Sequence, residues 1–279
     1  MTAGAGTEAP ARQSGEPIDC YRLDLTVCDE ADLALLDDLE RARAVRFHFD
    51  RDRIRYVAAH AQARRHLGAR LGVAPADVAL TTTHYGKPVL APAGPGDRFC
   101  FNLTHSGAVG YLAIASVSVG IDVELHRPIE DLHALIDTYC TRSEAAALTA
   151  LPDSERLAGF LGVWTRKEAV LKAWGTGIGA IPLDVLHVGT SAETVNARRI
   201  LLPDAESGPV AYPDLRVWSL ADGGQVLSLA AATPRRLQVR MMDPHMPPAT
   251  TPAAPSAAPS KEALPPAAVV STHTSRSKT

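Results

Sequence analysis

Apolar and polar residues alternate with period two in many short segments between residues 18 and 242, a pattern typical of β-strands. The predicted strands are 21–27, 99–103, 109–115, 119–125, 185–188, 195–202, 215–220, 226–232 and 237–242. A turn with the sequence His84-Tyr85-Gly86-Lys87-Pro88 precedes the second of these strands.

Apolar residues spaced three and four positions apart predict two helices within 32–71 and another within 154–174. Thr141 and Glu144 fit a capping box ahead of an Ala-rich helix that Pro152 ends. Helices and strands occur in both halves without regular βαβ alternation, so the sequence favours an α+β fold. The similar content of the two halves predicts two similar lobes in one chain, with the active site in the cleft between them.

The two ends of the chain differ in composition from the middle. Residues 1–17 are small and polar, and residues 243–279 are rich in Ala, Pro, Ser and Thr without any aromatic residue. Such segments bury too little apolar surface to offset the entropy of ordering, so we expect both to be disordered. The folded part then divides into an N-terminal lobe, 18–117, and a C-terminal lobe, 118–242.

Composition narrows the class of protein. The chain has 279 residues, 46% of them apolar, and a formal charge of -3. No apolar run approaches the ~20 residues that span a bilayer, and the start lacks the apolar core of a secretory signal. Four cysteines without C-x-x-C spacing are read as reduced thiols. We therefore expect a cytoplasmic protein without membrane or nucleic-acid partners. The presence of both lobes in one chain suggests a monomer.

One segment departs from this balance. Between Arg41 and Arg70 lie nine arginines and two acids, Asp50 and Asp52, which gives a local charge of +7. Clustered arginine is a feature of phosphate-backbone binding, so a nucleic-acid-binding module is an alternative function. The overall acidity of the chain and the scarcity of aromatic residues among the arginines argue against it.

A first group of candidate functional residues lies on the strand predicted at 119–125. Asp122 and Glu124 are two residues apart and point to the same side, opposite to Ile121 and Val123. Two carboxylates on one face repel each other unless water or a cation neutralises them. A hard divalent cation such as Mg²⁺ suits such oxygen ligands, whereas a polar strand face open to solvent is the alternative.

A second group lies on the helix predicted at 154–174. Glu168 falls on its apolar stripe, because eleven residues after Leu157 make almost three whole turns. A carboxylate that faces the interior needs a cation or hydrogen-bond donors. Lys172 lies one turn further on and can reach the same region; the alternative is a Glu168–Lys172 pair within the helix. The three acids and the lysine together predict a site for phosphate and magnesium.

These residues belong to motifs that resemble the signature of the 4′-phosphopantetheinyl transferases, in particular the pseudodimeric surfactin-synthetase-activating type. The likeness extends over about 40–186 and includes the turn at 85–88. Its three main motifs are Phe101-Asn102-Leu103-Thr104-His105-Ser106, Gly120-Ile121-Asp122-Val123-Glu124 and Trp164-Thr165-Arg166-Lys167-Glu168-Ala169-Val170-Leu171-Lys172.

The resemblance implies a transferase that moves the phosphopantetheine arm of coenzyme A to a serine of an apo acyl or peptidyl carrier protein. The second product is adenosine 3′,5′-bisphosphate, and the carriers serve fatty-acid, polyketide or nonribosomal-peptide synthesis. By resemblance, Asp122, Glu124 and Glu168 bind Mg²⁺, and Glu168 is the candidate base for the carrier serine. Lys172 would contact the pyrophosphate. Such chemistry depends mainly on positioning and on neutralising charge on phosphate oxygens.

The resemblance also implies a set of residues that bind coenzyme A. Arg43 and Arg55 match positions that hold the 3′-phosphate, where a guanidinium suits a dianion. The remaining matched positions are Lys87, Pro88, Thr104, His105, Asp122 and Lys172. Glu40 stands where some relatives carry a basic residue, which leaves the details of the 3′-phosphate contacts open. A carrier-binding protein that has lost catalysis is a further alternative, and the intact acids and Lys172 argue against it.

Overall fold

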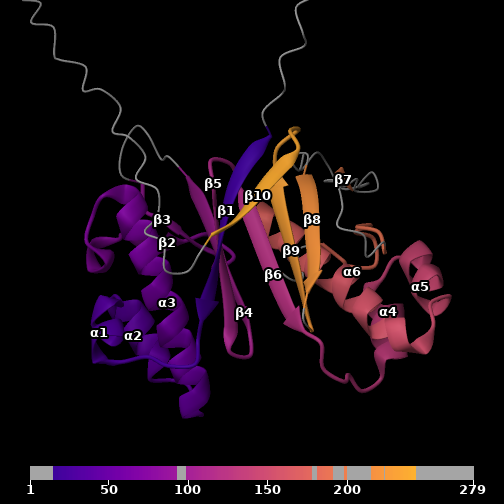
Figure 1. Ribbon diagram of the computed structural model, residues 1–279, viewed down its shortest axis with the longest axis horizontal. Helices are drawn as coiled ribbons and strands as arrows, with labels where there is room; N and C mark the ends of the chain where they lie inside the picture. Colours follow the sequence, from indigo (N-terminus) through magenta and orange to yellow (C-terminus); the bar gives the residue numbers. More distant parts are fainter. Residues whose placement is uncertain are drawn as a thin grey trace, which may run out of the picture.

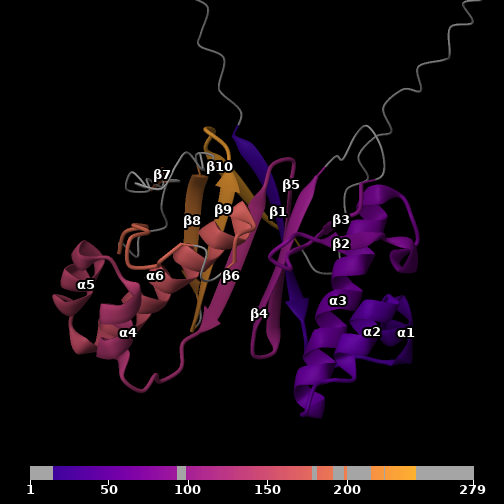
Figure 2. The same cartoon turned by 180° about the vertical axis from the view of Figure 1, so that it is seen from behind.

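The computed structural model describes residues 15–92, 99–177, 181–190, 198–199, 215–222 and 224–242. Two four-stranded sheets face each other, and each is covered by helices on its outer side (Figure 1). The view from behind in Figure 2 shows the same order of layers: helices, sheet, sheet, helices. The chain is therefore of mixed α and β type, in agreement with the α+β prediction. No helix in the described part is both long and apolar enough to cross a membrane.

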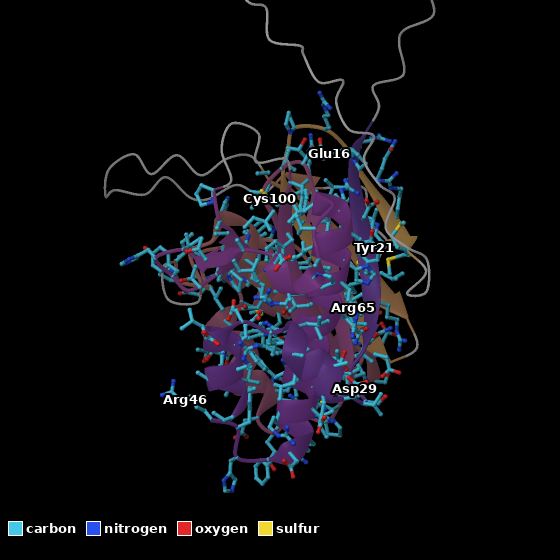
Figure 3. The ribbon with its side chains drawn as sticks, turned by 90° about the vertical axis from the view of Figure 1, so that its left-hand side faces the viewer. Glu16, Tyr21, Asp29, Arg46, Arg65 and Cys100 are labelled. Carbon is cyan, nitrogen blue, oxygen red and sulfur yellow. The ribbon has the colours of Figure 1, made fainter. Side chains whose placement is uncertain are left out.

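The outer layer on the N-terminal side consists of α1 (Glu30–Leu35), α2 (Asp38–Ala44) and α3 (Asp50–Leu71). Asp29 and Asp37 begin the first two helices with capping boxes, because each carboxylate accepts a hydrogen bond from the N–H three residues on. The helix α3 ends at Gly72, whose φ of 74° is left-handed and favours glycine. Figure 3 looks onto this layer, with Arg46 and Asp29 towards one end and Glu16 and Cys100 towards the other.

The first sheet has the order β10-β1-β5-β4. Its strands are β10 (Leu237–Met242), β1 (Glu16–Asp24), β5 (Val109–Ala115) and β4 (Cys100–Ser106). The last strand of the described chain, β10, pairs in parallel with the first, β1. Asp19 of β1, almost fully buried, is bound by Arg240 of β10 and by Arg70 of α3, which fixes the two ends of the fold together. A separate hairpin, β2 (Leu80–Thr82) with β3 (Pro88–Leu90), adjoins this half.

The second sheet has the order β6-β9-β8-β7. It consists of β6 (Val119–Leu125), β9 (Gln225–Ala232), β8 (Leu215–Asp222) and the short β7 (Arg198–Arg199). Its outer face carries α4 (Leu132–Tyr139), α5 (Arg142–Thr149) and α6 (Asp153–Trp174), of which α6 crosses the sheet. The strand β6 is the edge of this sheet and lies next to β4, the edge of the first sheet.

Strand alternation explains the apolar cores on the two faces of the first sheet. In β1, Tyr21 and Leu23 point towards α3, whereas Ile18 and Cys20 point towards the second sheet. The same rule places Phe101 of β4 on the helix side. The even-numbered residues of β4 then face β6, and these include Asn102, Thr104 and Ser106. The face that carries the predicted motif is thus fixed by the packing of its apolar neighbours.

The structure corrects several sequence predictions. Residues 185–188 are not a strand, because the backbone of 183–189 is bonded by the side chains of Lys167 and Glu144. Of the strand predicted at 195–202, only 198–199 lie within the described residues. The helix α4 and the hairpin β2–β3 had no clear periodicity and were not predicted. The capping box of Thr141 and Glu144 is confirmed.

The crossing of α6 over β6 depends on a glycine. A Cβ atom on Gly120 would lie 2.0 Å from the carbonyl oxygen of Ala169 and 2.4 Å from the nitrogen of Ala173, both in the backbone of α6. Backbone atoms cannot move aside as a flexible side chain can, so any other residue would push the helix away from the strand. This close approach brings Glu168 and Lys172 of α6 towards Asp122 of β6.

We expect Gly120→Ala to destabilise the protein by about 1–3 kcal/mol or more, since the added methyl group overpacks the crossing. Urea unfolding followed by circular dichroism measures the change. Gly162→Ala is the matched control within α6: its Cβ would meet only Nη2 of Arg166, at 3.8 Å. That control should be neutral or stabilising by up to about 1 kcal/mol, because alanine favours helix. Equal stability of both variants would show that the crossing has room for a side chain.

Candidate functional site

The two acids of β6 are held by hydroxyl groups from β4. Thr104 Oγ1 donates to Asp122 Oδ1 at 3.2 Å, and Ser106 Oγ donates to Glu124 Oε2 at 2.9 Å. Asn102 Oδ1 accepts the N–H of Ile121 at 2.8 Å. Asn102, Thr104 and Ser106, which alternate along β4, therefore bind positions 121, 122 and 124 of β6. The two hydroxyl groups fix the rotamers of both carboxylates.

Lys172 reaches the same place from α6. Its Nζ lies 2.5 Å from Asp122 Oδ1, 3.3 Å from Thr104 Oγ1 and 3.3 Å from the carbonyl oxygen of Ile121. The pair with Asp122 is largely shielded from water, so it is screened less than a surface ion pair. The alternative of an internal pair with Glu168 is not what forms, because the ammonium bonds to Asp122 across the crossing.

Glu168 points into the protein and is only 7% exposed. Its Oε1 atom and the Oδ2 atom of Asp122 are both buried, and neither has a hydrogen-bond partner among the residues that the structure describes. Burial, with the nearby charges of Asp122 and Glu124, raises the pKa of Glu168 to about 7, although Lys172 opposes the shift. Burial likewise raises the pKa of Asp122, against the influence of Lys172. Three acids thus share one region with a single ammonium group.

This donor set fits a magnesium ion. Within the described residues no three His, Cys, Asp or Glu side chains form a cluster arranged to hold a metal ion, and Lys172 holds one oxygen of Asp122. Two buried carboxylate oxygens nevertheless lack partners, and such groups are costly unless a cation or donor compensates them. Hard oxygen ligands of this kind are those that Mg²⁺ prefers. The residues that could hold it are Asp122, Glu124 and Glu168.

A pocket of about 180 Å³ opens in the N-terminal half. Its wall combines α2 and α3 with the hairpin turn and β4, and the polar lining includes Glu40, Arg43, His60, Arg64, Asn102 and His105. Gly86 and Pro88 of the turn contribute backbone and apolar surface. Three of the residues predicted to bind coenzyme A, Arg43, Pro88 and His105, therefore line one pocket.

The histidine His105 connects the pocket to the acids. Its ring is exposed, and it follows Thr104, the residue that bonds to both Asp122 and Lys172. Loss of hydration, together with the positive charges of Lys172, His60 and Arg55, lowers the pKa of His105. The residue is thus surrounded mainly by basic groups, an environment that favours an anion.

The arginines of the pocket differ in their availability. The guanidinium of Arg43 is exposed and lies over the ring of Tyr56, 5.6 Å from its centroid. Arg55 forms an ion pair with Asp52 at 3.4 Å and is not part of the pocket wall, although its charge reaches His105. Of the two arginines predicted to bind the 3′-phosphate, the structure therefore places Arg43 in the pocket and Arg55 beside it.

Glu40 is built into the wall of this pocket. Its carboxylate lies 2.6 Å from Nε of Arg64 and 2.7 Å from Nδ1 of His60. Although burial opposes the shift, the hydrogen bond and charge of His60 lower the pKa of Glu40. The residue thus neutralises its basic neighbours instead of facing a ligand with free charge.

The arginine-rich segment does not form a continuous basic face. Seven of its nine arginines have a carboxylate within 4.0 Å, namely 41, 51, 53, 55, 64, 65 and 70. Several of the acids, such as Asp32 and Asp19, come from outside the segment. The charge of +7 counted within the segment did not include these partners. Because most of the arginines are paired with acids, that charge no longer supports the nucleic-acid alternative.

Sequence reasoning did not single out Lys167 or Ser106, and it assigned Glu144 to a capping box alone. The buried ammonium of Lys167 lies 2.7 Å from Glu144 and also donates to the carbonyls of Leu183 and Leu186. Lys167 is part of the third motif, and its position next to the apolar stripe of the helix could have indicated that it is buried. Ser106 ends the first motif two residues after Thr104, so strand alternation could have placed both on one face.

Two family models match adjoining parts of this chain. The model described as 4′-phosphopantetheinyl transferase, N-terminal, matches residues 30–118, and the model of the 4′-phosphopantetheinyl transferase superfamily matches 118–223. The chain therefore belongs to the 4′-phosphopantetheinyl transferases, and the resemblance of its motifs is confirmed.

Individual relatives support the same assignment. The chain is 39% identical to the 4′-phosphopantetheinyl transferase HetI of Nostoc sp. over 154 residues, 53% of this chain and 63% of the relative. It is 33% identical to a phosphopantetheinyl transferase of Thraustochytrium sp. over 156 residues, 52% of this chain and 54% of the relative. It is 27% identical to the 4′-phosphopantetheinyl transferase Sfp of Bacillus subtilis over 206 residues, 74% of this chain and 86% of the relative. The chain thus spans less than two thirds of the first two relatives.

Replacing Glu168 by glutamine should change how the stability of the metal-free protein depends on pH. Because the pKa is raised from 4.5 to about 7, the neutral carboxyl stabilises the fold fully below pH 4.5, and this contribution is lost as the pH rises towards about 7. Glu168→Gln lacks that loss. Its melting temperature relative to the parent should therefore be higher at about pH 8 than at about pH 5.

Thermal unfolding in the presence of a chelator measures this difference. Glu155→Gln, an exposed acid on the same helix, is the control and should show no such dependence. Added Mg²⁺ should raise the melting temperature of the parent at about pH 8 and have less effect on Glu168→Gln, since a ligand bound only by the native state stabilises it. An identical pH profile of parent and Glu168→Gln would contradict the electrostatic account of the site.

Proposed function

We propose that this protein transfers the 4′-phosphopantetheine arm of coenzyme A to a serine of an apo acyl or peptidyl carrier protein. The observation that carries the proposal is the meeting of Asp122 and Lys172 with Glu168 at the crossing of β6 and α6, next to a pocket lined by Arg43 and His105. Acids for a divalent cation, an ammonium for phosphate oxygens and a pocket for a nucleotide are the parts that this reaction needs.

In the proposed reaction the serine oxygen attacks the phosphorus that carries the pantetheine. A new P–O bond forms, the bond to the bridging oxygen of the pyrophosphate breaks, and adenosine 3′,5′-bisphosphate leaves. Glu168 accepts the serine proton, directly or through a water molecule, because a serine hydroxyl is a poor nucleophile without a nearby base. Lys172 neutralises charge on the phosphate oxygens once its contact with Asp122 is shared with the substrate.

Asp122, Glu124 and Glu168 would hold the magnesium ion. When bound, Mg²⁺ supplies positive charge to the pyrophosphate and makes it a better electrophile. The hydroxyl groups of Thr104 and Ser106 orient two of these acids beforehand. Such preorganisation reduces the rearrangement that metal binding requires.

The pocket would hold the nucleotide part of coenzyme A. Arg43, which lines the pocket, would bind the 3′-phosphate with Arg55 nearby, and His105 with Thr104 would contact a phosphate of coenzyme A. Pro88 and the backbone of the turn border the base. We further propose that residues 18–117 and 118–242 form two lobes related by a pseudo-twofold axis, that the reaction takes place in a cleft between them, and that the protein acts as a cytoplasmic monomer.

A transfer assay tests the proposal. The protein is incubated with coenzyme A, Mg²⁺ and apo carrier proteins of the fatty-acid, polyketide and nonribosomal-peptide types, and each carrier is weighed by mass spectrometry. We expect a gain of one phosphopantetheine arm on at least one carrier, dependent on Mg²⁺. No gain on any of them would overturn the proposed function.

Variants of the site should separate the roles of its residues. Asp122→Asn and Glu168→Ala should abolish transfer, and Lys172→Ala should reduce kcat by about 100-fold or more, because each removes charge that stabilises the transition state. Glu155→Gln, an exposed acid of α6, should retain the activity of the parent. Transfer at the parent's rate by Asp122→Asn or Glu168→Ala would mean that the metal site lies elsewhere.

A further inference from the structure

The side chain of Lys87 does not contribute to the pocket that its own turn borders. The turn is closed by hydrogen bonds from Gly86 N to the Thr83 carbonyl and from Thr83 N to the Lys87 carbonyl, each 2.9 Å. Gly86 has a φ of 80°, which favours glycine at this position. Gly86 and Pro88 line the pocket, whereas the ammonium of Lys87 extends into the other half of the molecule.

Two carbonyl oxygens receive this ammonium. Lys87 Nζ donates to Val119 O of β6 at 2.9 Å and to Lys172 O of α6 at 2.6 Å. No carboxylate among the described residues lies within salt-bridge distance of it, so the lysine is used as a hydrogen-bond donor and not as half of an ion pair. Burial, with the nearby charge of Lys172, lowers the pKa of Lys87 to about 8. The backbone carbonyls of Val119 and Lys172 therefore fix the position of the Lys87 side chain.

The contact falls on the last turn of α6, where carbonyl groups lack partners within the helix. Gly175 N and Thr176 N take the carbonyl of Leu171, and Ser118 Oγ donates to that of Ala173. Between them, the carbonyl of Lys172 receives Gly175 N at 3.2 Å and Lys87 Nζ at the shorter distance of 2.6 Å. A cation at this end also interacts favourably with the helix dipole.

Lys87 binds the backbone carbonyl of Lys172, and the side-chain ammonium of Lys172 contacts Asp122. Lys172 is thus held at both ends: its backbone by Lys87 and its side chain by β6. Any displacement of the end of α6 would move this ammonium, and also Glu168 one turn earlier. The hairpin turn therefore links the wall of the pocket to the part of the helix that faces the acids.

We propose that Lys87 is a positioning residue, which joins the turn at the pocket wall to the C-terminal end of α6 and so holds Lys172 and Glu168 in place against β6. The inference rests on the proposed function for its catalytic consequence, but the contact itself does not. It predicts that loss of the ammonium reduces kcat, while the affinity for coenzyme A, which depends on the pocket, changes little.

The test compares Lys87→Met, which keeps the aliphatic stem without the ammonium, with Lys87→Arg, which keeps donors. His84→Ala, an exposed residue of the same turn, is the matched control. We expect Lys87→Met to lower kcat by about 10–100-fold, as loss of an outer partner does in other sites, with KM for coenzyme A within about twofold of the parent. Lys87→Arg should recover part of kcat, and His84→Ala should match the parent.

A second measurement does not depend on transfer. Amide hydrogen exchange in peptides that cover 168–177 should be faster in Lys87→Met than in the parent, and intermediate in Lys87→Arg, because the last turn of α6 loses an external partner. If Lys87→Met fails to fold, Lys87→Arg against His84→Ala gives the same comparison. A parent without transfer activity would defeat the proposed function, and the exchange data would still test the contact.

Two results would overturn the inference. A raised KM with unchanged kcat in Lys87→Met would show that the ammonium contacts coenzyme A and does not position α6. Exchange in 168–177 and kcat both equal to those of the parent would show that the contact with the Lys172 carbonyl has no effect on the helix. In the latter case Lys87 would merely fill the space below the turn.

Discussion

The unpaired edge of β6 is the constraint on which this structure depends. The second sheet ends at β6, so the backbone groups of Val119, Ile121 and Leu125 on that edge have no hydrogen-bonded strand beside them in the described part of the chain. Buried backbone groups without partners are costly, and an open edge also invites pairing with other chains. Here side chains complete the edge: Lys87 and Lys172 donate to its carbonyls, and Asn102 and Ser106 accept its N–H groups. Polar residues are therefore required between the two halves before any function is considered.

Closing the edge in this way leaves an excess of negative charge beside it. The same strand alternation that turns Val119 and Ile121 to the core turns Asp122 and Glu124 the other way, towards α6. Gly120 lets α6 approach closely enough to bring in Glu168, but among the described residues the only ammonium paired with one of the three acids is that of Lys172. Burial, together with the charges of the neighbouring acids, raises the pKa values of Asp122 and Glu168. A bound cation would reduce the repulsion between the carboxylates.

The sequence predicts those features of the site that depend on residues within one helix or strand. It does not predict those that depend on contacts between elements far apart in the chain. Periodicity within one element placed Asp122 and Glu124 on one face and turned Glu168 inwards, and the structure has both features. The direction of the Lys87 side chain depends on how a hairpin meets a helix 85 residues later, and no local pattern contains that. Residues 185–188 looked like a strand because they are apolar, yet their backbone partners are side chains. Secondary-structure propensity predicts single helices and strands, whereas the site forms where β6 and α6 cross.

The orientation of α6 needs a second anchor, because contacts on one face alone would allow the helix to roll. Lys167 precedes Glu168 and is turned from it by about 100°. Its ammonium is fully buried against Glu144 and two carbonyls of the loop. Although burial opposes the shift, the hydrogen bond and charge of Lys167 lower the pKa of Glu144. A buried ion pair adds little net stability compared with apolar packing, so its effect here is to fix position. With Lys167 bound on one side and Lys172 on the other, rotation of α6 would break both sets of bonds, and Glu168 between them is held towards β6.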